Sequence, residues 1–230
     1  FSMYLNGAGV GSMMMVVGLA ITVVMMFGWF GAVVSESETG AYNKQVDRSF
    51  RWGMFWFIFS EVMFFAAFFG VLFYARTLSV PWLGGAGSEF MTNLELWKGY
   101  EAAWPTNGPG EIGGDFQTMG AWGLPAINTL ILLTSGVTIT WAHWGLMKEN
   151  RRQLVLGLLA TVALGALFVV LQAIEYGHAY QDLNLTLESG IYGSTFYMLT
   201  GFHGMHVTVG AIMLLVMLLC SMRGHYTPKH

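Results

Sequence analysis

The chain has 230 residues, of which 55% are hydrophobic and only 10% charged, with a net charge of −3 and a mean hydropathy of +0.56. A soluble domain carries about a quarter of its residues as charged side chains. This chain therefore faces lipid, and a nucleic-acid partner is not expected. The single cysteine, Cys220, excludes an internal disulfide and does not fit a thiolate metal site.

Five apolar stretches are each long enough to cross a bilayer, which takes about 20 residues. We predict membrane helices near residues 10–34, 52–74, 122–147, 154–176 and 195–222. Each stretch mixes Gly, Ser or Thr with its Leu, Val and Phe, which is typical of packed membrane helices. The sequence thus predicts an all-α, polytopic membrane protein with one transmembrane domain over residues 1–230.

The basic residues predict the orientation of these helices. Eight of the ten Lys and Arg residues follow the first, third or fifth predicted helix, namely Lys44, Arg48, Arg51, Lys148, Arg151, Arg152, Arg223 and Lys229. The positive-inside rule places that side in the cytoplasm, or in the matrix if the protein is mitochondrial. Phe1 then lies outside and His230 inside. Because the sequence begins with Phe1 and not with methionine, we expect the complete gene product to be longer.

Residues 76–121 form a long segment on the outer side of the membrane. The segment is rich in glycine and contains Trp82, Trp97 and Trp104. A loop of this length is usually functional or disordered. Because indole rings favour the membrane–water interface, we expect these tryptophans to hold the segment as a cap on the outer surface.

The second predicted helix contains one carboxylate, Glu61, within the run "FSEVMFFAAFFG". Helical spacing places Phe57, Phe64, Phe65 and Phe68 on the same face. An ionised carboxylate in the bilayer centre costs about 2.5–3.5 kcal/mol on insertion scales. Glu61 is therefore expected either to be protonated at pH 7 or to have a partner, and an interhelical hydrogen bond to a histidine of the fifth helix is compatible with both.

The other polar residues within the predicted helices are few. In "GFHGMHV", His203 and His206 lie three residues apart and share a helix face. Glu175 and His178 form a Glu-x-x-His pair, but a di-iron site needs a second such pair and further carboxylates. Hydrogen bonding between helices is the preferred interpretation of these residues and of His143, and no metal site is predicted.

A bis-histidine heme requires two histidines at matching depths on facing helices. His143 lies near the inner end of its helix, whereas His203 lies in the outer half of its own. Their depths do not match, so heme bound by this chain is not expected.

Cations near the inner helix ends include Arg48, Arg51, Arg223 and the ionisable His225. Such positions lie at the level of phosphate headgroups and favour phospholipid binding. For the residues alone, ordinary topology determination is the preferred explanation.

Taken together, several segments resemble subunit III of cytochrome c oxidase, in the heme–copper terminal oxidase superfamily. They are "RWGMFWFIFSEVMFFAAFFG" (51–70), "INTLILLTSGVTITWAHWGLM" (127–147), "LQAIEY" (171–176) and "IYGSTFYMLTGFHGMHVTVGA" (191–211). The resemblance covers nearly the whole chain in order and spacing. It implies a subunit of an aerobic oxidase that has no catalytic residue, heme or metal of its own.

The resemblance also assigns roles to individual residues. Glu61 falls at the family's carbodiimide-reactive glutamate, and Glu36, Arg51, Arg223 and His225 fall at positions that line its phospholipid cleft. Heme and copper belong to partner subunits I and II, with subunit I as the main contact. The family subunit is expected to support subunit I, fast proton uptake and bound phospholipid.

The resemblance implies seven helices, so one is expected before and one after the five in this sequence. Subunit III of a ubiquinol oxidase, which has five helices, is an alternative. A proton-coupled transporter that uses Glu61, Glu175 and the histidines is a less favoured one, and a self-contained heme or metal oxidoreductase is another. The bacterial plasma membrane is the expected location, with the mitochondrial inner membrane as the alternative.

Overall fold

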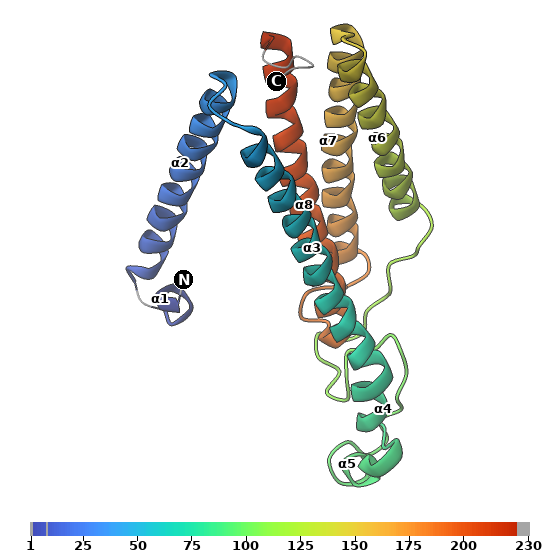
Figure 1. Cartoon of the computed structure of the whole chain (residues 1–230). Helices are drawn as coiled ribbons and strands as arrows, with labels where there is room; N and C mark the ends of the chain where they lie inside the picture. The colour runs from blue at the N-terminus through green and yellow to red at the C-terminus, as the bar shows by residue number, and fades with distance from the viewer. Residues whose placement is uncertain (1, 8, 225–230) are drawn as a thin grey trace. The chain divides into compact units, whose positions relative to one another are not determined.

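The computed structural model describes residues 2–7 and 9–224, and within them the regular structure is entirely helical (Figure 1). Five helices are long and apolar enough to cross a membrane, which confirms the predicted fold class. The elements are α1 (Ser2–Leu5), α2 (Gly11–Glu38), α3 (Lys44–Tyr74), the π-helix η1 (Ala75–Ser79), α4 (Val80–Leu83), η2 (Gly87–Glu89), α5 (Phe90–Glu95), α6 (Leu124–Met147), α7 (Arg151–Gln181) and α8 (Gly190–Arg223).

Four of the five long helices extend beyond the predicted ranges. Hydropathy marks only the part of a helix that faces lipid, whereas backbone hydrogen bonding continues into the polar ends. Helix α3, for example, begins at Lys44, where the Asn43 side chain accepts hydrogen bonds from the backbone N–H groups of Gln45 and Val46, both at 3.0 Å. This is an N-cap, which satisfies donors that the first turn leaves free.

The described residues divide into two compact units, and the boundary lies within α3 between Trp56 and Phe57. The first unit contains α1, α2 and the first part of α3. Most of its side chains are exposed although α2 is strongly apolar. Tyr42 lies in the turn between α2 and α3. Its ring stabilises this turn by packing edge-on against Phe50, with the ring centroids 5.3 Å apart.

In the second unit, α7 packs between α6 and α8 (Figure 1). Ala142, Leu154, Leu158 and Leu218 form a buried apolar cluster near the inner ends of these helices. Their close approach depends on glycine, because a Cβ at position 157 would lie 2.7 Å from that of Ala142.

The outer segment after α3 is partly helical, through η1, α4, η2 and α5, and then irregular up to α6. Its last part packs on the outer ends of α7 and α8, where the Phe116 and Tyr192 rings stack with centroids 5.4 Å apart. The Asn184 side chain donates a hydrogen bond of 2.8 Å to the Asp115 carbonyl. These contacts order the chain just before α6 and help to place the outer end of that helix.

Candidate functional site

Glu61 of α3 and His206 of α8 form the most notable polar contact within the apolar helices. The imidazole Nε2 of His206 hydrogen-bonds Oε2 of Glu61, and both side chains are about one-third exposed. Both residues belong to the second compact unit. Two histidines were predicted on the fifth membrane helix, which is α8. His206, and not His203, is the one that contacts the Glu61 carboxylate.

Aromatic rings surround the Glu61–His206 pair. The ring of Phe65 packs edge-on against the imidazole with centroids 5.3 Å apart, and Phe64 lies 5.8 Å from it. Phe64 also contacts Phe202, one turn before His206 on α8, at 5.1 Å. These rings limit the access of water, so a hydrogen bond within the pair is stronger here than in water.

The second nitrogen of His206 fixes its tautomer. Nδ1 lies 2.6 Å from the carbonyl oxygen of Phe202, and a carbonyl can only accept, so Nδ1 carries a hydrogen. One proton therefore lies between Nε2 and Glu61. Whether it sits on the carboxyl or on the imidazole, the pair has no net charge. The arrangement can hold a proton in an apolar setting at low electrostatic cost.

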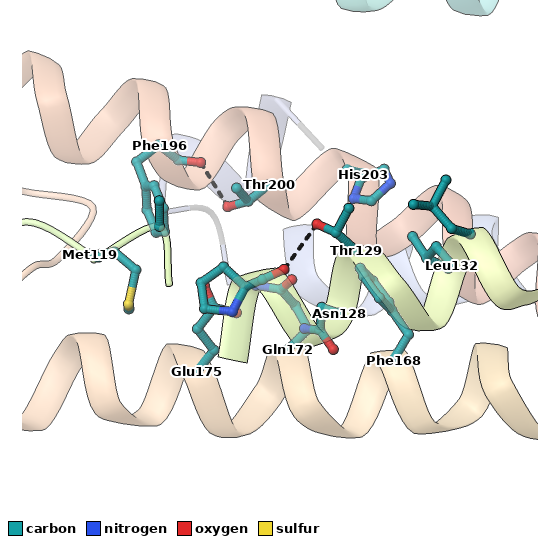
Figure 2. A pocket seen from close by; sticks show the side chains of 14 residues that line it. Met119, Asn128, Thr129, Leu132, Phe168, Gln172, Glu175, Phe196, Thr200 and His203 are labelled. Atoms are coloured by element: carbon teal, nitrogen blue, oxygen red, sulfur yellow. Dashed lines mark hydrogen bonds between the residues drawn. The ribbon is translucent and has the colours of Figure 1, made fainter. Parts of the chain in front are cut away.

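His203 and Glu175 lie apart from this pair, on the wall of a cavity of about 570 Å³ between α6, α7 and α8 (Figure 2). The His203 ring packs edge-on against Phe168 with centroids 5.5 Å apart. Glu175 is only 5% exposed. The cavity is also lined by Asn128 and Gln172, which were not among the predicted site residues. The signal that would have found them is an amide within an apolar helix.

The remaining histidines of the helices are not brought into either site. His143 is exposed near the inner end of α6. His178 is exposed and hydrogen-bonds Asp182 at 2.5 Å, whereas Glu175 is buried, so the Glu-x-x-His pair does not converge. Within residues 2–7 and 9–224, no three His, Cys, Asp or Glu side chains are grouped in a way that would hold a metal ion.

The residues expected to bind lipid lie near the inner ends of α2, α3 and α8. Tyr42 donates a hydrogen bond of 2.7 Å to Glu36, and chiefly this bond raises the pKa of the Tyr42 phenol. Arg51 pairs with Asp47 at 3.1 Å, with both side chains largely exposed. Arg223 is the last residue of α8, and His225 lies outside the described residues.

Comparison with known proteins identifies the chain's relatives. The family model "Cytochrome c oxidase subunit III" matches residues 1–91 and 90–230. A protein named "Cytochrome c oxidase subunit 3" from Pongo pygmaeus is 38% identical over 218 residues, which covers 94% of this chain and 73% of that protein. The protein of the same name from Marchantia polymorpha is 37% identical over 229 residues, covering 99% and 76%. With its five apolar spans, this multi-pass membrane chain belongs to the cytochrome c oxidase subunit III family.

Proposed function

We propose that this chain is the non-redox subunit III of an aerobic cytochrome c oxidase and supports the catalytic subunit during electron transfer to oxygen. In this assignment heme and copper belong to subunits I and II, and subunit I is the main contact. The relatives carry the name of a cytochrome c oxidase, which favours this complex over a ubiquinol oxidase. We place it in the bacterial plasma membrane, with the basic helix ends on the cytoplasmic side.

The Glu61–His206 pair carries the second part of the proposal, which is support of proton uptake. The hydrogen bond, the surrounding Phe64 and Phe65 rings and the protonated Nδ1 leave one shared proton and no net charge. Such a pair can pass one proton between a carboxyl and an imidazole within the apolar part of the protein. We infer that Glu61 helps to maintain proton entry into the oxidase at high pH.

Replacing Glu61 with glutamine tests this role in the complete oxidase. The glutamine amide can donate to Nε2 of His206, so the interhelical bond is kept, but the shared proton is lost. Oxygen consumption by the Glu61→Gln oxidase should stay close to wild type near neutral pH. By about pH 9 it should fall about threefold below wild type, which corresponds to roughly 0.6 kcal/mol of barrier.

A matched control is Glu101→Gln, because Glu101 is exposed in the outer segment. Its pH profile should follow that of the wild type. If the ratio of Glu61→Gln to wild-type activity is the same at every pH, Glu61 has only a structural role and the proton part of the proposal is wrong.

We also propose that the inner helix ends bind phospholipid through Glu36, Arg51, Arg223 and His225. The exposed guanidinium of Arg51 and the position of Arg223 at the end of α8 support headgroup contacts. Arg51→Gln and Arg223→Gln oxidases should each retain less phospholipid after detergent washing, measured by mass spectrometry of extracted lipid. Arg76→Gln, on the outer side, is the control, and equal lipid retention in all three variants would contradict the assignment.

A further inference from the structure

The cavity between α6, α7 and α8 contains polar atoms that the chain does not satisfy. Asn128 is 3% exposed, and neither its Nδ2 nor its Oδ1 has a hydrogen-bond partner within the described residues. The Nε2 atom of Gln172 is buried and equally unpartnered. Glu175 is also largely buried, at 5% exposure, but its carboxyl oxygens are not among the fully buried atoms that lack a partner. Buried polar groups of this kind are normally paired, and in a membrane each unpaired group costs several kcal/mol.

These side chains come from two helices and face a third. Figure 2 shows Asn128 on α6 and Gln172 and Glu175 on α7, with Phe196 and Thr200 of α8 on the opposite side. The cavity has the size of a small-molecule site, with mostly apolar walls and a few convergent polar groups. The geometry therefore points to a ligand that brings hydrogen-bonding groups into a largely apolar cavity that is open on one side, where Leu133 is exposed.

Asn128 and Glu175 lie nearer the outer surface than much of the apolar lining, although His203 lines the cavity at the level of Phe168. Asn128 is in the first turns of α6 and Glu175 in the last turns of α7, so both are near the outer ends of their helices. Leu132, Leu133 and Phe168 line the cavity closer to the membrane centre. An amphiphile with its headgroup at the outer surface and its tail directed inward matches this order.

The polar groups also define the headgroup. No Lys or Arg lines the cavity, and the one basic side chain there, His203, packs against Phe168 deeper in the membrane. A phosphate at the outer end would therefore lack a guanidinium or ammonium partner among the lining residues, and the Glu175 carboxyl would repel it if ionised. A hydroxyl both donates and accepts. It can therefore satisfy the acceptor Oδ1 of Asn128 as well as the donors of Asn128 and Gln172. A carbonyl group, which only accepts, would leave Oδ1 unpaired.

We propose that this cavity binds a neutral membrane lipid with a hydroxylated headgroup, of the diacylglycerol type. The hydroxyl donates to Oδ1 of Asn128 and accepts from the amide N–H groups of Asn128 and Gln172, and an acyl chain lies along Leu132 and Phe168. The site is separate from Glu61 and His206 and from the basic inner helix ends. The proposal is therefore independent of the roles suggested for those residues.

The test uses the intact oxidase complex and a diacylglycerol with a photoreactive diazirine on one acyl chain. After irradiation, mass spectrometry should find the label on peptides of α6 and α7 that contain Leu132, Leu133 or Phe168. Phosphatidylglycerol with the same labelled chain should react far less at these peptides. In Asn128→Leu and Gln172→Leu, labelling by the diacylglycerol should fall about fivefold, the usual effect of losing one neutral hydrogen bond.

Gln181→Leu is the matched control, because Gln181 is an exposed amide on the same helix as Gln172 and should label like the wild type. If the leucine variants fail to assemble, two measurements remain. Excess unlabelled diacylglycerol should suppress labelling of the wild type, and Leu133→Trp, which fills the cavity from an exposed position, should abolish it.

Several results would overturn the proposal. They are equal labelling by phosphatidylglycerol, labelling that survives Asn128→Leu, and no competition in the wild type. A structure of the complete complex in which only waters, or side chains of another protein segment, satisfy Asn128 and Gln172 would also do so.

Discussion

Replacing Gly157 with leucine is expected to destabilise the packing of α7 against α6 by about 3 kcal/mol or more, the upper part of the range for overpacked interiors. An ideal Cβ at position 157 would lie 2.7 Å from the Cβ of Ala142 and 2.9 Å from its Cα and backbone N. The obstacle is backbone and not the end of a flexible side chain. The two helices would therefore have to move apart.

Separation of α6 and α7 would also disturb the hydrogen bond of 2.7 Å between the Thr138 and Thr161 hydroxyls. We expect Gly157→Leu to lower the detergent and thermal stability of the subunit, measured as its loss from the purified oxidase on heating. Gly177→Leu is the control on the same helix, because a Cβ at Gly177 meets no atom within 4 Å. Equal stability of the two variants would mean that the α6–α7 contact is looser than described.

Replacing Arg151 with methionine is expected to cost about 2–3 kcal/mol, as for the loss of hydrogen bonds from a charged donor to a buried group. The guanidinium Nε and Nη2 of Arg151 donate to the carbonyl oxygen of Ser221 at 3.0 and 2.5 Å. Ser221 is 2% exposed and lies in the last turn of α8, where its carbonyl otherwise accepts, among the described residues, only a 3.3 Å hydrogen bond from the N–H of Gly224. Arg151 thus joins the start of α7 to the end of α8.

The neighbouring Arg152 provides a matched control. Like Arg151, it is exposed and carries the same charge on the same side of the membrane, but its side chain makes no hydrogen bond to the residues that the structure describes. Arg152→Met should therefore weaken the positive-inside signal as much as Arg151→Met but leave stability nearly unchanged. Denaturation of the reconstituted oxidase, followed by the accessibility of Cys220 on α8 to a thiol reagent, separates the two. If Arg152→Met is as unstable as Arg151→Met, net inner charge and not the Ser221 contact is responsible.

The five membrane helices could be predicted because length and hydropathy are sufficient for helices that lie in lipid. The small residues within the apolar stretches likewise indicated close packing of the helices, and the structure places Gly157 and Thr161 against Ala142 and Thr138. The need of Glu61 for a partner followed from the cost of a carboxylate in the bilayer. The sequence could not choose between His203 and His206, because residues three apart share one helix face.

The cavity between α6, α7 and α8 could not be predicted. Asn128 and Gln172 come from different helices, and each alone is an ordinary amide in an apolar stretch. Whether these two side chains meet depends on the distance between α6 and α8 on either side of α7. The pattern of apolar residues in the sequence does not determine that distance. Glu175 is buried and His178 is exposed, although both are on α7. This difference depends on the rotation of α7 about its axis, which the sequence does not determine.

The neutrality of the Glu61–His206 pair has a consequence for an energised membrane. Moving one charge fully across a membrane with a voltage of 100 mV changes its energy by about 2.3 kcal/mol. Transfer within the pair moves the proton by only about 1 Å in a core about 30 Å thick, so the voltage contributes less than about 0.1 kcal/mol. The position of the proton within the pair should therefore be almost insensitive to the electrical gradient.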